Sequence, residues 1–254
     1  MTGGVEGRHA LVTGGGRGIG RAVAAALTGA GARVTLLGRD RAALDEAVRT
    51  GVGAGAVTAD VTDGEAVRAA IEAAHAERGP VDLLIANAGA AVSAPFARSD
   101  EALFRRMLDV NLMGVVHPAR LLAGPMAERG FGRIVAVAST AGLKGYPYVS
   151  AYCAAKHAVI GFTRALALEI ATTGVTVNAV CPGFTDTDLV VQSLDTITAK
   201  TGRSREDALK ELVRHNPQGR LIDPREVAEA VLWLCGERAR SVTGQAIAVA
   251  GGEV

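Results

Sequence analysis

The sequence predicts an α/β protein built on a doubly wound parallel sheet of about seven strands, with helices on both faces. Short runs rich in Val, Ile and Leu recur along the chain, and Ala-rich stretches of helical period separate them. The composition agrees, because 49% of the 254 residues are hydrophobic, 32 are Gly and only 4% are aromatic. Such values are typical of a compact core with many tight turns. No linker or repeat divides the chain, so we expect one nucleotide-binding and catalytic domain over 1–254.

The apolar runs and the periodic stretches alternate in the order strand, helix, strand. The predicted strands are His9 to Thr13, Arg33 to Leu37, Ala56 to Ala59, Leu83 to Ala86, Arg133 to Ala138, Val175 to Val180 and Ala246 to Val249. The predicted helices are Arg21 to Ala30, Glu65 to Arg78, Leu103 to Arg129, Ala151 to Ala171 and Pro224 to Cys235. Such alternation places the helices between parallel neighbouring strands.

Two helix starts carry the spacing of a capping box, in which a side chain accepts a hydrogen bond from an exposed backbone N–H group. They are Thr62 with Glu65, and Asp223 with Glu226. We expect Pro118 and Pro125 to kink or shorten the fourth helix, because proline has no N–H to donate.

One segment interrupts the alternation. Residues 186–221 insert charged and polar side chains between the sixth strand and the last helix. We interpret this segment as a helical flap over the strand ends, placed to cover a substrate.

Charge and cysteine usage exclude several classes of function. Lys and Arg number 27 against 26 Asp and Glu, so no bulk positive field attracts nucleic acid or an anionic membrane. Cys153, Cys181 and Cys235 are far apart and form no C-x-x-C pair, so neither a disulfide framework nor a zinc site is indicated. The first residues have no signal-peptide pattern, and no long apolar run follows. We therefore expect a cytoplasmic protein.

The histidines show neither metal-ligand spacing nor a nucleophilic serine partner, so we expect no metal site. They are His9, His75, His117, His157 and His215.

A glycine-rich loop follows the first predicted strand directly and precedes a helical pattern. It runs from Thr13 to Gly20 as T-G-G-G-R-G-I-G. Glycines allow the backbone to approach a pyrophosphate closely, and the following helix N-terminus offers free N–H groups and a positive dipole end. The loop therefore predicts a dinucleotide site, although a glycine-rich turn without a ligand is the simpler alternative.

Together with Asn87-Ala88-Gly89 after the fourth strand, this loop resembles the short-chain dehydrogenase/reductase family, and the resemblance spans essentially the whole chain. It implies a Rossmann-type fold, and catalysis by four residues, which are Asn111, Ser139, Tyr152 and Lys156. It also implies cofactor contacts from the following residues: Gly14, Arg17, Gly18, Ile19, Gly20, Gly38, Arg39, Asp60, Val61, Asn87, Ala88, Gly89, Val110, Tyr152, Lys156, Pro182, Gly183, Thr185 and Thr187.

The residue types explain the chemistry. Tyr152 and Lys156 are four apart, so both side chains lie on one face of a helix. A neighbouring ammonium favours the phenolate and lowers the pKa of a phenol toward the range useful for a general acid or base. Ser139 is placed to hydrogen-bond the substrate oxygen. The resemblance gives Asn111 a water that connects Lys156 to solvent. Singly, such residues are more often a surface pair and a turn.

The substrate pocket is expected to be largely apolar. Its predicted lining consists of Ser139, Ala141, Leu143, Tyr146, Tyr152, Phe184, Leu189 and Val190. Stretches such as 139–142 and 180–184 resemble polyketide and 3-oxoacyl thioester reductases, but residues 90–93 lack the Pro-Gly-Gly run of aromatic polyketide ketoreductases.

Cofactor choice is predicted from the end of the second strand, where a carboxylate pairs with a free ribose hydroxyl and an Arg receives a 2′-phosphate. Gly38 and Arg39 stand there, with Arg17 able to approach from the glycine-rich loop. NADP(H) is therefore expected. One alternative is that Asp40 bonds the ribose and restores NAD(H) use. The other is that Arg39 is a solvated charge that leads the next helix and that Asp40 caps this helix.

The expected function is hydride transfer between NADP(H) and a ketone or secondary alcohol, with reduction of a 3-oxoacyl thioester preferred. The alternatives are an NAD-dependent dehydrogenase of a small, cyclic or aryl secondary alcohol or 3-hydroxy acid, an isomerase, dehydratase or epimerase, and a non-catalytic nucleotide sensor. The resemblance also implies a homotetramer. The predicted helices at 103–127 and 151–171 carry surplus apolar residues for it, namely Leu112, Val115, Leu121, Leu122, Val159, Ile160, Phe162, Leu166 and Leu168.

Overall fold

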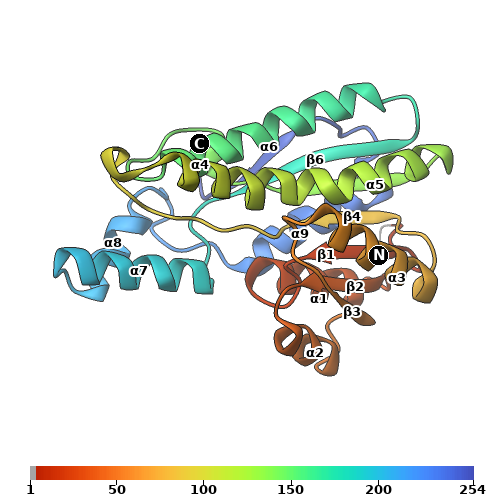
Figure 1. Cartoon of the computed structure of the whole chain (residues 1–254), viewed down its shortest axis with the longest axis horizontal. Coiled ribbons are helices and arrows are strands. Elements are labelled where there is room, and N and C mark those ends of the chain that lie inside the picture. The colour runs from red at the N-terminus through yellow and green to blue at the C-terminus, as the bar shows by residue number, and fades with distance from the viewer. Residues whose placement is uncertain (1–3) are drawn as a thin grey trace.

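The computed structural model describes residues 4–254 and contains one seven-stranded sheet in which all strands are parallel (Figure 1). The strand order is β3-β2-β1-β4-β5-β6-β7, which confirms the predicted doubly wound sheet. The strands are β1 (His9–Thr13), β2 (Arg33–Gly38), β3 (Gly55–Thr58), β4 (Leu83–Ala86), β5 (Gly132–Val137), β6 (Val175–Pro182) and β7 (Ala246–Val249).

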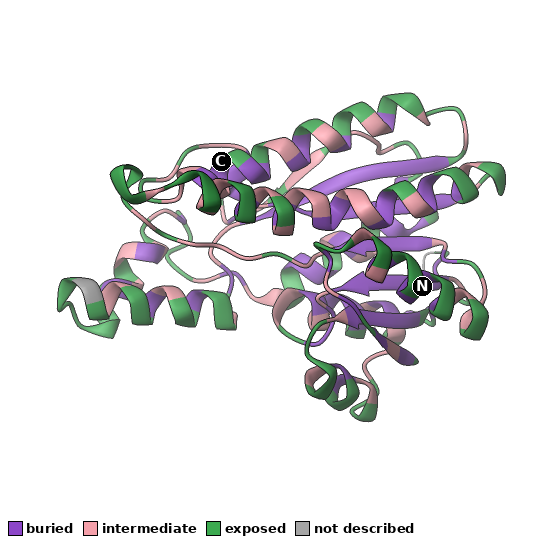
Figure 2. Ribbon diagram, in the orientation of Figure 1, coloured by how far each residue is buried: buried purple, intermediate pink, exposed green. Residues whose placement is uncertain are grey.

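The central strands β1, β4, β5 and β6 are buried along their whole length and are mostly apolar, because both faces of the sheet are covered. Val12 of β1 packs in one core cluster, whereas its neighbour Leu11 packs in the cluster on the opposite face. Side chains of α1 (Gly18–Gly29), α2 (Arg41–Arg49) and α9 (Pro224–Cys235) join the first cluster. Those of α3 (Gly64–Arg78), α5 (Gly114–Glu128) and α6 (Ser150–Glu169) join the second. Figure 2 shows the buried strands between outwardly exposed helices.

The helix starts differ in part from the prediction. Asp223 and Glu226 form the predicted capping box at the start of α9. Thr62 does not cap α3, because the Asp63 carboxylate accepts from the backbone N–H groups of Glu65 and Ala66 instead. Helix α2 begins directly after Asp40, which caps it, as the alternative interpretation of Arg39 and Asp40 predicted.

The long helix predicted over 103–129 is three consecutive segments. Helix α4 (Glu101–Leu108) is followed by a π-helical turn, η2 (Asp109–Met113), and then by α5. Both Pro118 and Pro125 lie inside α5, so the change of helical register precedes the prolines. π-helical turns inside helices are frequent at functional sites, and this one contains Asn111.

The segment predicted as a flap forms two helices, α7 (Asp188–Thr201) and α8 (Arg205–Val213). They pack on each other through a small apolar cluster that includes Val190, Leu194, Ala208 and Leu212. Figure 1 shows the pair extending outward from the end of the sheet rather than lying across it. In the described part of the chain, no helix is long and apolar enough to cross a membrane.

The order of the strands fixes where a site can form. The chain leaves β1 toward β2 on one side, whereas β4 pairs with β1 on the other. Crossover connections therefore diverge between the carboxyl ends of β1 and β4, and ligands of open α/β sheets bind at such a point.

Candidate functional site

The glycine-rich loop after β1 has a shape that side chains would obstruct. Gly14 and Gly18 have φ of 65° and 51°, in the left-handed region that favours glycine. A Cβ atom at Gly20 would lie 2.2 Å from the Gly14 carbonyl oxygen. Arg17 makes no side-chain cap at the start of α1, and the first turn, which includes Ile19, holds no acidic residue. Its free N–H groups and positive dipole end fit the pyrophosphate of a dinucleotide.

Asn87 joins the loop after β4 to the glycine-rich loop. Its Nδ2 donates to the carbonyl oxygens of Thr13, at 2.9 Å, and of Gly14, at 3.3 Å. The Thr13 hydroxyl accepts in turn from the backbone N–H groups of Asn87 and Ala88, both at 3.0 Å. Through these hydrogen bonds, Asn87 fixes the position of the glycine-rich loop relative to the loop after β4.

Ser139, Tyr152 and Lys156 come together at the carboxyl end of β5. Ser139 follows β5 and begins the short 3-10 turn η3 (Thr140–Gly142), with its Oγ accepting from Ala141 N at 3.1 Å. Tyr152 and Lys156 share one face of α6, and Lys156 Nζ lies 5.7 Å from the centre of the Tyr152 ring. Nζ also donates to the Val137 carbonyl oxygen at 2.9 Å, in a buried position.

Burial dominates the acid–base properties of this group. It raises the pKa of Tyr152 to about 12, although a hydrogen bond with the Ser139 side chain acts in the opposite direction. It lowers the pKa of Lys156 to about 8. In the protein alone, burial therefore holds the pKa of the Tyr152 phenol above its usual value, whereas the sequence-based expectation is a pKa lowered by Lys156.

Asn111 is fully buried in the π-helical turn and holds the loop that follows β4. Its Nδ2 donates to the carbonyl oxygens of Ala90, at 2.9 Å, and of Met107, at 3.0 Å. Its Oδ1 accepts from Ala90 N at 3.3 Å. A Cβ atom at Gly89 would lie 2.8 Å from Asn111 Oδ1 and 3.6 Å from Lys156 Nζ, so both polar groups border the same small space.

The carboxyl end of β2 presents a glycine and a cation. A Cβ atom at Gly38 would meet only Leu44, at 3.5 Å, so a side chain has room there. Arg39 is exposed, and its Nη1 lies 3.6 Å from Asp60 Oδ2. A hydrogen bond from the backbone N–H of Thr62 is the main cause of the lowered pKa of Asp60.

Asp40, the alternative ribose partner, is already engaged in two ways. Its carboxylate accepts from Ala43 N at 3.1 Å as the cap of α2. It also pairs with Arg17 Nη2 at 2.5 Å, which links the glycine-rich loop to the end of β2. Arg17 remains 65% exposed in this pair.

The loop after β6 returns toward the glycine-rich loop. Pro182 ends β6, and the Gly183 carbonyl oxygen accepts from the Thr185 hydroxyl at 3.0 Å. Thr187 precedes α7, and a Cβ atom at Gly18 would lie 3.2 Å from its methyl carbon. Residues predicted to bind the cofactor in the loop after β1 thus lie close to those in the loop after β6.

Two predicted cofactor residues lie inside the protein framework. Val61 is buried against Gly114 at the start of α5, and Val110 is partly buried in the π-helical turn. His117, which the sequence analysis left unassigned, holds this loop, because its Nδ1 lies 2.9 Å from the Val61 carbonyl oxygen. Only the packing of α5 on α3 reveals this contact.

The residues predicted to line the substrate pocket divide into two groups. Val190 is buried between α7 and α8, and Ala141 is buried in η3. Both side chains therefore pack inside the protein in this structure. Leu143 is partly buried against the core. Phe184 contacts Tyr146 edge to face at 6.0 Å between ring centres, and Leu189 is 40% exposed on the flap.

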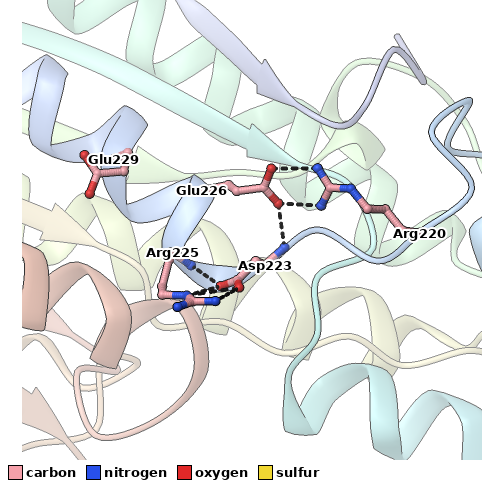
Figure 3. A pocket seen from close by; sticks show the side chains of 5 residues that line it. All are labelled: Arg220, Asp223, Arg225, Glu226 and Glu229. Atoms are coloured by element: carbon pink, nitrogen blue, oxygen red, sulfur yellow. Dashed lines mark hydrogen bonds and ion pairs between the residues drawn. The ribbon is translucent and has the colours of Figure 1, made fainter.

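A charged groove at the start of α9 is separate from this site. It is lined by Arg220, Asp223, Arg225, Glu226 and Glu229 (Figure 3). Arg220 forms a two-pronged pair with Glu226 at 2.6 and 2.7 Å, and Arg225 pairs with Asp223 at 2.5 Å. The groove lacks the predicted catalytic residues. Its ion pairs involve Asp223 and Glu226, which form the capping box of α9, so they stabilise the start of this helix. Among the described residues, no cluster of His, Cys, Asp or Glu is arranged to hold a metal ion.

Known proteins match this chain over most of its length. The sequence model of the short chain dehydrogenase family matches residues 8–197. A "Putative ketoacyl reductase" of Streptomyces coelicolor is 41% identical over 249 residues, which cover 96% of this chain and 95% of that protein. An "Acetoacetyl-CoA reductase" of Shinella zoogloeoides is 37% identical, covering 97% of this chain and 98% of that protein.

The solved structures agree with the sequence matches. A crystal structure of a variant of actinorhodin polyketide ketoreductase with NADPH superposes with a TM-score of 0.92. It shares 39% sequence identity, and the match covers 97% of each chain.

Proposed function

We propose that this chain, which belongs to the short-chain dehydrogenase family, is an NADPH-dependent reductase of 3-oxoacyl thioesters. Its reaction class is the interconversion of a ketone and a secondary alcohol with a nicotinamide cofactor. The observation that carries the proposal is the group formed by Ser139, Tyr152 and the buried Lys156 at the end of β5. A regulator that only senses nucleotides has no need of such a proton-transfer group.

In the proposed mechanism, the bound nicotinamide supplies the hydride to the carbonyl carbon. Ser139 keeps its proton and donates a hydrogen bond to the carbonyl oxygen, while its Oγ accepts from Ala141 N. Tyr152 donates the proton that converts this oxygen to the alcohol, and a phenol with a raised pKa is fully protonated at neutral pH. The Lys156 ammonium stabilises the resulting phenolate.

The proton on Tyr152 must then be replaced from solvent. We propose that a water in the space beside Gly89 carries it, accepting from Lys156 Nζ and donating to Asn111 Oδ1, which has a lone pair left after bonding Ala90 N. Nicotinamide ribose contacts by Tyr152 and Lys156 follow from the same assignment, as do backbone contacts by residues 87–89 and 182–187.

Two features support a thioester as substrate. The relatives named as ketoacyl and acetoacetyl-CoA reductases match over nearly their whole length. Phe184 lies just before the flap and Leu189 lies at its start, and the apolar surface of both suits an acyl chain. Closure of α7 and α8 would exclude water. A small cyclic or aryl ketone is the alternative substrate class.

The catalytic assignment is tested by Tyr152→Phe, which removes only a hydroxyl. Reduction of acetoacetyl-CoA, followed by the absorbance of NADPH, should fall at least about a hundredfold because general acid catalysis is lost, while NADPH binding persists. Tyr148→Phe is the matched control, since Tyr148 lies in the same segment but is 64% exposed. Lys156→Met should weaken NADPH binding as well as the rate. Retained activity in Tyr152→Phe, or activity only on simple cyclic ketones, would contradict the proposal.

NADPH is proposed as the preferred cofactor because Gly38 offers no carboxylate, while Arg17 and Arg39 both expose their guanidinium groups. Asp40 is committed to its helix cap and to Arg17, which leaves it poorly placed to bond a ribose hydroxyl. A 2′-phosphate would attract both arginines, and Arg binds phosphate in a two-pronged manner.

We predict a preference for NADPH over NADH of at least about tenfold in kcat/KM, or about 1.4 kcal/mol. The double change Gly38→Asp with Arg39→Ile should shift it toward NADH, because a carboxylate repels the phosphate and a cation is removed. Arg41→Ile is the control, since Arg41 instead pairs with Asp45 on α2. Equal or better wild-type rates with NADH would overturn the assignment.

We propose a homotetramer in which copies of the chain meet through the outer faces of α5 and α6. Fewer apolar residues are exposed on these faces than the sequence indicated. Val115, Leu122, Val159 and Ile160 are buried within the chain's own core. Leu168 on α6 is 82% exposed, which favours burial against another copy. Light scattering at micromolar concentration should give about four times 25.9 kDa, and a monomer mass would contradict the proposal.

The cytoplasm is the proposed location. All three cysteines are free and buried, which suits a reducing compartment.

A further inference from the structure

Residues 250–253 connect three parts of the site. A Cβ atom at Gly251 would lie 2.0 Å from Asn216 Oδ1, and one at Gly252 would lie 3.5 Å from Pro217, so this segment packs closely on the chain that returns from the flap. Glu253 then reaches the segment between the catalytic Ser139 and Tyr152. The segment therefore contacts both the flap connection and the catalytic loop.

The Glu253 side chain is only 1% exposed and is held by specific partners. The Tyr146 hydroxyl donates to Glu253 Oε1. Lys144 Nζ lies 3.1 Å from Oε1 and donates to the Glu253 main-chain oxygen at 3.2 Å. The Tyr146 hydroxyl also lies 2.7 Å from Thr140 Oγ1, next to Ser139. A buried carboxylate needs such partners, and it fixes them in return.

The second carboxylate oxygen faces the cofactor loop. Glu253 Oε2 is buried and has no hydrogen-bond partner among the described residues. It lies 3.1 Å from where a Cβ atom at Gly183 would stand. A single carboxylate thus lies against the loop after β6 as well as the loop after β5.

We propose that Glu253 is a positioning residue that holds Tyr146 and Lys144 so that the Tyr146 ring forms a fixed wall of the substrate pocket. The proposal rests on the proposed function, since it assigns that wall to the thioester substrate. Glu253 touches neither Tyr152 nor Lys156 in the hydrogen bonds of the structure, so it acts on substrate fit rather than on proton transfer.

The bonding of Tyr146 determines what the pocket presents. Its hydroxyl is occupied by Glu253 and Thr140, so only the ring is available to a substrate. Burial, followed by the hydrogen bond to Glu253, raises the pKa of Tyr146, which keeps this phenol neutral. Because its hydroxyl proton is held by Glu253, Tyr146 does not compete with Tyr152 as the proton donor.

The contacts of Glu253 with Tyr146 and Lys144, here called the clamp, are linked to the flap through aromatic contacts of Tyr146. The Tyr146 ring meets Phe184 at 6.0 Å and His215 at 5.8 Å between ring centres, both edge to face. Phe184 lies just before α7, and His215 follows α8. Fixing Tyr146 therefore also fixes the wall against which both ends of the flap pack.

The first experiment compares steady-state kinetics of Glu253→Ala and Tyr146→Phe with wild type. In Glu253→Ala, the KM for acetoacetyl-CoA should rise about tenfold, while kcat changes less than about threefold and the KM for NADPH is unchanged. The double variant Glu253→Ala with Tyr146→Phe should have the same KM for acetoacetyl-CoA as Glu253→Ala alone, because both changes remove the same contact. Glu72→Ala is the matched control, since Glu72 pairs only with Arg68 on the exposed surface of α3. A fall in kcat without a rise in KM, or additive effects in the double variant, would overturn the proposal.

The second experiment does not depend on catalysis. Hydrogen–deuterium exchange of residues 140–148 should be at least about fivefold faster in Glu253→Ala than in Glu72→Ala, because the clamp that orders the loop is absent. Tyr146→Phe, which removes only a hydroxyl, should also increase this exchange. Exchange equal to that of the control would overturn the clamp, whether or not the thioester proves to be the substrate. Faster exchange in a protein that reduces no thioester would contradict the proposed function and leave the clamp supported.

Discussion

The site depends on a cation held where water does not solvate it. Lys156 Nζ is buried and donates to the Val137 carbonyl oxygen at 2.9 Å, so the backbone at the end of β5 fixes the position of the ammonium. Burial lowers the pKa of Lys156 to about 8 and raises that of Tyr152 to about 12. The same desolvation keeps the phenol protonated and makes the ammonium ready to release its proton. At neutral pH the phenol therefore keeps its proton for donation, and an ammonium with a pKa of about 8 is still charged and can stabilise the phenolate that forms.

Sheet topology brings the remaining groups to this pair. Because all strands are parallel, the loops after β1, β4, β5 and β6 meet at one edge of the sheet. Asn87 ties two of these loops together, and Asn111 holds the backbone of Ala90 beside Lys156. Glycine supplies the close approaches, as at Gly20, where a side chain would collide with Gly14. The residues proposed to bind the cofactor and those proposed to transfer the proton are therefore adjacent because of the order of the strands in the sheet.

The sequence predicts what depends on local pattern. The strands, the glycine-rich loop and the Tyr152–Lys156 spacing are all local, and the structure contains each of them. The sequence does not predict the π-helical turn, because the register change at Asp109–Met113 depends on packing around buried Asn111. Helix α2 is indicated only by its cap, Asp40, because the helix is short and mostly exposed and has no strong apolar pattern. Contacts such as Glu253 with Tyr146 join residues more than a hundred positions apart, and no local signal indicates them.

We propose that the buried Lys156 ammonium supports proton donation by Tyr152. The pH profile of kcat/KM for ketone reduction tests it most directly, because kcat/KM reports the ionisation of groups in the free enzyme. We expect a plateau in kcat/KM below about pH 8, where Lys156 carries its proton. Above that pH the value should fall about tenfold per pH unit, as expected when one proton is lost. A profile that stays flat to about pH 10, where only an ordinary exposed lysine begins to titrate, would contradict the account.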